Sequence, residues 1–267
     1  MSDVVLYEVA ERVATVTLNR PEARNALSAK VRRTLPRVMQ QADEDPGVDV
    51  IILTGADPAF CAGLDLKELG SGEHRLAAPE QEPGPAPADG PTRGPFGPVT
   101  KPVIGAVNGV AVTGGFELAL HCSWLVASER ARFADTHARV GIQPGWGLTV
   151  LLAEAVGARR ARELSATGNF LDAGTALGWG LVNHVVPHDQ LLAFCRQLAA
   201  DIVSNDQRGV QRILRTYDEQ QLVDGTGAWR IEADAGRAWL RDGGSSPEEI
   251  EARRRSITER GRAQTGD

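Results

Sequence analysis

Hydrophobic and polar positions alternate near the N-terminus with the two-residue period of a half-buried β-strand. The run Arg12–Leu18 follows this pattern, and Val4–Val9 before it is rich in β-forming residues, so the two runs predict a hairpin. A turn-rich stretch comes next, and Ser28 is a typical N-cap for a helix towards Asp45. Pro36 is expected to kink that helix.

Two later runs are almost entirely apolar, as expected of strands buried on both faces, and Asp49 is the one charged residue in them. They cover Val48–Leu53 and Val103–Val107, and each ends at a glycine-bearing loop that leads into a helical pattern. Repeated strand–loop–helix order predicts parallel strands joined by crossover helices. The expected fold class is therefore α/β, with ligand sites near the strand ends.

After residue 147 the pattern becomes mainly helical. Helices are expected over 191–202, 207–221, 226–241 and 247–261. This organisation predicts a core over residues 1–200 and a C-terminal helical region over 201–267 that serves oligomerisation. The proline-rich stretch 78–98 is either a surface excursion or a lid over a pocket.

Composition narrows the class of protein. The 267 residues carry a net charge of −6, which disfavours nucleic acid as a partner. No apolar run reaches the roughly 18 residues that a membrane span needs, and the N-terminus lacks a signal-peptide layout. The three cysteines, Cys61, Cys122 and Cys195, are widely spaced and indicate free thiols in a cytoplasmic protein.

Two glycine-bearing segments, 59–67 and 108–118, carry the candidate chemistry. Gly114 and Gly115 precede a helical run, and the first amides of a helix have no partner inside it. A second amide from the Gly63–Leu64 turn would complete an oxyanion hole. Such a pair of donors stabilises an enolate or a tetrahedral oxyanion.

Glu117 follows Gly114 by three residues and lies in an otherwise apolar stretch. One interpretation makes it a structural acid that caps amides or pairs with an arginine. The other makes it a general base whose pKa is tuned by burial. The local pattern alone leaves both open.

These segments, together with 101–109 and 141–145, resemble the enoyl-CoA hydratase/isomerase family. The likeness runs from Val4 to about Pro187 and is looser in the C-terminal helices. It implies a crotonase-like spiral of ββα units closed by C-terminal helices, assembled as a homotrimer or a homohexamer. It also implies an acyl-CoA thioester as substrate, with no metal or redox cofactor.

The resemblance assigns roles to individual residues. The N–H groups of Leu64 and Gly114 occupy the oxyanion-hole positions, and Glu117 matches the first catalytic glutamate. Arg24 takes the place of a basic residue near the CoA phosphates, although a solvated loop charge is the alternative. The residues expected beside the adenine and pantetheine of CoA are Ala62, Gly63, Leu64 and Asp65.

His137 departs from the family pattern, which has a second glutamate twenty residues after the first. An imidazole can exchange a proton with the α-carbon of the substrate near neutral pH, so His137 is a candidate catalytic residue. Alternatively it only fills the position, and hydration is slow or lost. Asp135 is close enough to tune the ring, but on a strand it would face the other side.

Reversible hydration of a 2-enoyl-CoA is therefore the leading hypothesis, with Glu117 positioning the water. The alternatives are isomerisation, thioester hydrolysis, decarboxylation, or acyl-CoA binding without turnover. Pro187 separates His184 and His188 and argues against a metal site there. Trp146 is expected to wall the acyl pocket or only to pack.

Overall fold

The computed structural model describes residues 4–70, 94–217, 237–238, 241 and 246–265. Most of the proline-rich stretch 78–98 and most of the helix expected over 226–241 lie outside the described residues.

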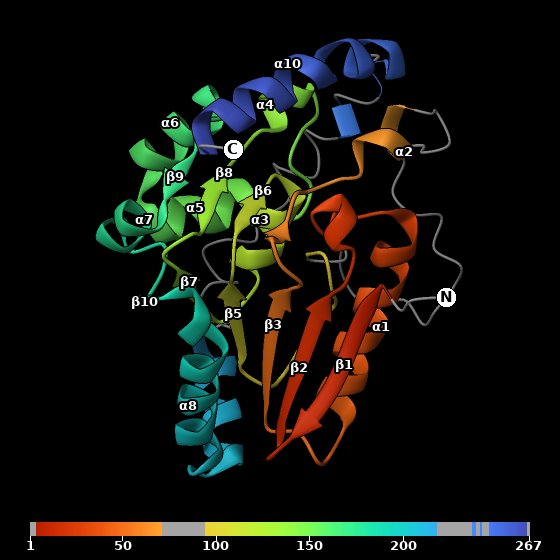
Figure 1. The fold of residues 1–267 in the computed structure, drawn as a ribbon. Coiled ribbons are helices and arrows are strands. Elements are labelled where there is room, and N and C mark those ends of the chain that lie inside the picture. The colour runs from red at the N-terminus through yellow and green to blue at the C-terminus, as the bar shows by residue number, and fades with distance from the viewer. Residues whose placement is uncertain (1–3, 71–93, 218–236, 239–240, 242–245, 266–267) are drawn as a thin grey trace.

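A six-stranded sheet forms the base of the molecule, in the order β1-β2-β3-β5-β7-β10 (Figure 1). Only β1 and β2 pair antiparallel, which confirms the predicted hairpin, and the other pairs are parallel. The strands are β1 (Val5–Ala10), β2 (Val13–Leu18), β3 (Val50–Gly55), β5 (Val103–Val107), β7 (Trp124–Ser128) and β10 (His184–Val186).

A smaller sheet follows the order β4-β6-β8-β9. It consists of β4 (Ala59–Cys61), β6 (Val110–Val112), β8 (Arg132–Ala134) and β9 (Leu171–Asp172). The first three are parallel and β9 is antiparallel to β8. Each of the first three follows a strand of the larger sheet after a short turn, so the chain alternates between two sheets before each crossover.

Helices surround and cap the two sheets. They are α1 (Ala29–Glu44), α2 (Leu66–Gly70), α3 (Gly114–Leu120), α4 (His137–Val140), α5 (Leu148–Val156), α6 (Ala158–Thr167), α7 (Ala173–Trp179), α8 (Leu191–Val203) and α10 (Pro247–Thr265), with 3-10 turns at Pro21–Ala23 and His188–Gln190. Residues 207–217 are helical as well. Ser28 caps α1 as predicted, because its hydroxyl accepts a hydrogen bond from the Val31 N–H. The helix continues through Pro36 to Glu44.

The burial of strand β3 explains why Val50–Leu53 is apolar at every position. Ile51 and Leu53 pack into the main core, while Val50 and Ile52 pack into a second core on the opposite face. Helix α8 supplies Leu191, Cys195 and Ala199 to that second core. A strand covered on both faces needs hydrophobic side chains at every position.

The C-terminal helix α10 crosses the molecule above α2 and α4, at the end opposite α8 (Figure 1). Ile250 is only 2% exposed and forms a small core with Val140 and Ile142. Leu64 and Leu66 pack against the same cluster. This helix therefore closes the molecule directly over one of the predicted site segments.

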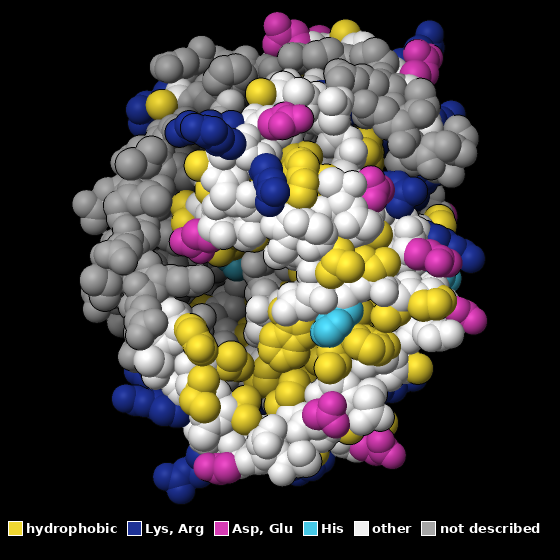
Figure 2. Space-filling model, turned by 90° about the vertical axis from the view of Figure 1, so that its left-hand side faces the viewer, with side chains coloured by type: hydrophobic (Ala, Val, Ile, Leu, Met, Phe, Trp, Pro, Cys, Tyr) yellow, Lys and Arg dark blue, Asp and Glu magenta, His cyan; other side chains and the backbone are white. Residues whose placement is uncertain are grey.

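No helix within the described ranges is long and apolar enough to cross a membrane. Figure 2 shows hydrophobic side chains gathered on the face that carries α7, β10 and α8. Partly buried residues of that region include Trp124, Val186 and Phe194, and Leu177 is exposed.

Candidate active site

The two glycine segments adjoin, as the sequence predicts. Gly63 has a φ of 84°, a conformation that favours glycine. A Cβ on Gly63 would lie 2.6 Å from the carbonyl oxygen of Val112 and 3.5 Å from the amide nitrogen of Gly114. Leu64, the next residue, forms an isolated parallel bridge with Leu27, which holds the turn in place.

Helix α3 begins at Gly114, packed closely onto the end of β4. A Cβ on Gly115 would lie 2.2 Å from the carbonyl oxygen of Cys61, so only glycine fits there. Thr113 precedes the helix with a φ of 54°, which is strained for a β-branched residue. Among the described residues we find no acceptor for the N–H of either Leu64 or Gly114. Two adjacent backbone donors are thus available for an external oxygen.

Glu117 lies on the first turn of α3 and is 3% exposed. Its Oε1 accepts hydrogen bonds from the N–H of Trp146 at 2.8 Å and from the N–H of Gly145 at 3.2 Å. Its Oε2 lies 3.4 Å from Nε2 of His137. The backbone of residues 145–146 therefore fixes one carboxylate oxygen and leaves the other beside the histidine.

Asp135 also contacts His137, and the prediction that it faces the other side is wrong. Residues two positions apart on a strand point to the same face, so strand alternation would not have separated Asp135 from His137. Strand β8 also ends at Ala134, before either residue. The Oδ1 of Asp135 lies 2.6 Å from Nδ1 of His137 and accepts the His137 N–H at 3.1 Å. The imidazole is held between two buried carboxylates.

This arrangement favours a charged imidazole. Burial opposes the charge, but the hydrogen bonds and negative charges of Asp135 and Glu117 outweigh it and raise the pKa of His137 to about 9. Burial also works against ionised Asp135, yet its bonds to His137 leave the pKa of Asp135 below its usual value. At neutral pH His137 is therefore an imidazolium and a proton donor.

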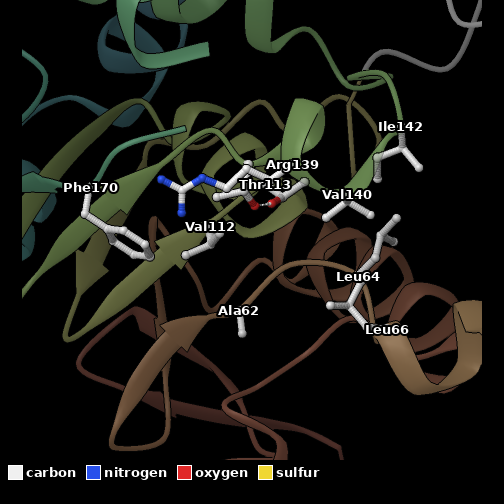
Figure 3. Close-up of a pocket in the computed structure, with 10 residues that line it drawn as sticks. Ala62, Leu64, Leu66, Val112, Thr113, Arg139, Val140, Ile142 and Phe170 are labelled. Atoms are coloured by element: carbon white, nitrogen blue, oxygen red, sulfur yellow. Dashed lines mark hydrogen bonds between the residues drawn. The ribbon is translucent and has the colours of Figure 1, made fainter. Parts of the chain in front are cut away.

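A cavity of about 90 Å³ opens beside these groups (Figure 3). Most of its lining is apolar. Thr113 and Thr136 contribute the hydroxyl groups of the wall, and these two hydroxyls are hydrogen-bonded to each other. The lining residues are Ala62, Leu64, Leu66, Val112, Thr113, Thr136, Arg139, Val140, Ile142 and Phe170. Glu117 and His137 are not part of this wall, but Thr113 and Thr136 directly precede Gly114 and His137.

The residues predicted to hold CoA separate into two places. Ala62 and Leu64 line the cavity, while Arg24 lines a second, polar pocket of about 530 Å³ together with Arg130 and Arg132. The Arg24 carbonyl nevertheless accepts a hydrogen bond from the Ala62 N–H, so its backbone lies beside that segment.

Asp65 forms an ion pair with Arg20, a residue that the sequence did not indicate as part of the site. Its carboxylate pairs with the Arg20 guanidinium at 3.0 Å. An arginine and an aspartate 45 positions apart carry no local signal of this contact.

The remaining candidates have structural roles. The three cysteines are buried free thiols, and burial raises the pKa of Cys61 to about 12, which disfavours its reactive thiolate. No cluster of potential metal ligands occurs in the part of the chain that the structure describes. His188 bonds to Ser128 and Asp57, away from His184.

Comparison with known proteins decides the family. A model of the enoyl-CoA hydratase/isomerase family matches residues 8–235. The chain belongs to the enoyl-CoA hydratase/isomerase family. Its mixed α/β fold, with short parallel strands at two glycine loops, is the crotonase fold of that family.

Members of this family with hydratase names are similar over most of the chain. The probable peroxisomal enoyl-CoA hydratase 1 of Arabidopsis thaliana is 38% identical, with 85% of this chain and 83% of that protein aligned. The crotonyl-CoA hydratase of Syntrophomonas wolfei is 34% identical over 86% of this chain and 87% of its own. The crystal structure of an enoyl-CoA hydratase from Mycobacterium smegmatis is 49% identical, with a TM-score of 0.80, and covers 90% of this chain and 100% of that one.

Proposed function

We propose that this enzyme catalyses the reversible addition of water to a 2-enoyl-CoA, giving a 3-hydroxyacyl-CoA. The thioester oxygen accepts hydrogen bonds from the N–H groups of Leu64 and Gly114. These donors polarise the enoyl system and stabilise the enolate that forms when water attacks carbon 3. The reaction needs no metal or redox cofactor.

Glu117 and His137 share the two proton transfers. The Glu117 carboxylate takes a proton from water as its oxygen bonds to carbon 3. The His137 imidazolium gives its Nε2 proton to carbon 2 of the enolate. The proton then on Glu117 returns to His137 across the 3.4 Å contact between them, which restores both groups.

The observation that carries this proposal is the imidazolium that the two carboxylates create at the position of the family's second glutamate. A protonated carboxylic acid and an imidazolium are both proton donors, so the substitution preserves the required chemistry. Asp135 holds Nδ1 and thereby points Nε2 towards Glu117.

The direct test is turnover of crotonyl-CoA and longer 2-enoyl-CoAs, with mass spectrometry of the products. Glu117→Gln keeps the shape but cannot accept the proton, and should lower kcat by about 10²- to 10⁴-fold. The matched control is Glu154→Gln, which changes an exposed glutamate on α5 and should leave kcat unchanged.

A mass gain of water in a Glu117-dependent reaction supports hydration. An unchanged mass with a shifted double bond, loss of the acyl group or loss of CO₂ would replace hydration by isomerisation, hydrolysis or decarboxylation. Tight binding without any turnover would make the chain a binding protein.

For the carrier, Ala62, Gly63, Leu64 and Asp65 would lie along the pantetheine and adenine, and Arg24 would hold phosphates. Arg24, Arg130 and Arg132 line one pocket together with Asp57 and Glu129, and the three guanidinium groups support an anion site there. The cavity of about 90 Å³ supports a short acyl group.

The assembly belongs to the same proposal: a homotrimer or homohexamer in the cytoplasm. The apolar side chains around α8 and β10 support burial of that face against another copy (Figure 2). Light scattering of the purified protein should give three or six times the mass of one chain.

A further inference from the structure

His121 lies directly after α3, one helical turn beyond Glu117, and has no part in the proposed proton transfers. Its Nε2 lies 2.6 Å from the carbonyl oxygen of Trp146. Because a carbonyl oxygen only accepts, the ring must carry its proton on Nε2 and donate it. The contact thus selects one tautomer of the imidazole.

The surroundings keep this imidazole neutral. Burial lowers the pKa of His121, although the bond to Trp146 and the charge of Glu117 act in the opposite direction. The ring of Phe96 meets the imidazole nearly edge-on, with centroids 6.1 Å apart. The backbone of Gly94 is so close that a Cβ there would lie 2.4 Å from the ring. His121 is therefore a fixed, neutral hydrogen-bond donor.

Trp146 connects His121 to the acid. Its carbonyl accepts from His121, while its N–H donates to Oε1 of Glu117 at 2.8 Å. Its indole ring would lie 3.3 Å from a Cβ on Gly114, the residue whose N–H is a proposed oxyanion donor. The position of this single residue affects both the base and the oxyanion hole.

The segment that carries Trp146 has little regular structure of its own. It runs from Gly141, with a φ of 85°, to Gly147, with a φ of 88°, between the short helix α4 and α5. The N–H of Ile142 donates to the His137 carbonyl at its start, and the bonds at residues 145 and 146 tie its end to Glu117 and His121. Loss of one of them would allow the peptide to shift.

We propose that His121 is a positioning residue, which clamps the Trp146 peptide against Glu117 and so fixes the direction of the carboxylate. The inference rests on the proposed hydration by Glu117. His121 itself touches no reacting atom, so its removal should change the rate of the chemical step more than the binding of the acyl-CoA.

The test compares His121→Leu with His121→Gln. Leucine removes the donor, and kcat for crotonyl-CoA should fall by about 10- to 100-fold with KM changed less than about threefold. Glutamine carries an amide N–H on a flexible chain that can reach the same carbonyl, so it should recover most of the lost kcat. Gln40→Ala, which removes an exposed contact with Glu44 on α1, is the control and should match wild type.

Hydrogen exchange of the amides of residues 145–147 gives a second readout that does not depend on turnover. Exchange should be faster in His121→Leu and return towards wild type in His121→Gln. Unchanged kcat and exchange in His121→Leu would overturn the inference, as would equal losses of kcat in both variants. If wild type itself shows no Glu117-dependent hydration, the proposed function fails instead, whatever the exchange shows.

Discussion

His137 sits between Asp135 and Glu117, and this arrangement places one positive charge between two negative ones in a buried site. Breaking such a set by removing one partner is costly, because an uncompensated charge stays buried. The charge on the imidazole therefore depends on both carboxylates. With only one of them the pKa of His137 would be lower, and a smaller fraction of the imidazole would carry the proton at the same pH.

The ionisation of His137 predicts a pH limit for catalysis. Hydration needs the imidazolium, so kcat/KM should fall as the pH rises through about 9, the pKa of His137. In Asp135→Asn one negative charge is lost, and the fall should move to lower pH by about one to two units. Initial rates across pH 6 to 10, on both proteins, measure this. An identical profile for the two proteins would contradict the role of Asp135.

The same ionisation affects stability. Because the pKa of His137 is raised from its usual 6.5 to about 9, its stabilising effect is complete below pH 6.5 and is lost as the pH rises towards 9. The loss is on the order of 3 kcal/mol, from 1.36 kcal/mol per pH unit. Urea unfolding at pH 6.5 and at pH 9 should show a decrease that His137→Gln lacks.

At the level of elements, helix α10 packs against residues that line the cavity. Ile250 packs on Val140 and Ile142, and these two residues also line the cavity. Leu64 and Leu66 also pack against the Ile250 cluster and line the cavity. The C-terminal helix therefore supports the apolar end of the cavity from behind, opposite Arg139 and Phe170 (Figure 3).

Shortening Ile250 should therefore change both stability and substrate range. Ile250→Ala removes a buried side chain and should lower the free energy of unfolding by about 2–5 kcal/mol. The extra space should also raise kcat/KM for longer enoyl-CoAs relative to crotonyl-CoA. Ile250→Val is the control and should cost only about 0.5–1.5 kcal/mol. Chain-length preference equal to wild type in Ile250→Ala would separate α10 from the acyl pocket.

The elements also show what a single sequence can predict. The hairpin, β3, β5 and the start of α1 follow from period and capping, because these are local signals. The strands of the smaller sheet, such as β6 and β9, have three and two residues, too few for a period to appear. Their existence depends on pairing with distant strands.

Some residues of the candidate site could likewise be predicted from the sequence, and others could not. Gly63, Gly114 and Glu117 could be found from their local pattern and from the family resemblance. The contact of Asp135 with His137 was missed although their spacing allows it, because residues two apart share a face of a strand. The role of the Trp146 backbone has no sequence signal, since any residue supplies an N–H and a carbonyl.

Across the whole molecule, the two sheets bring together segments that lie far apart in the sequence. The turn after β4, the start of α3 and the residues after β8 meet at one end of the smaller sheet, under α10 (Figure 1). The rigid larger sheet, covered on both faces, supports these loops from below. This division between a buried scaffold and loops with chemistry is common in enzymes with parallel sheets.

The crystal structure of a complex with an unreactive acyl-CoA, such as butyryl-CoA, would test the account most directly. The thioester oxygen should lie about 2.7–3.1 Å from the amide nitrogens of both Leu64 and Gly114. Carbons 2 and 3 should then face His137 and Glu117, respectively. A thioester bound away from these two amides, or an acyl chain that leaves both side chains out of reach, would contradict it.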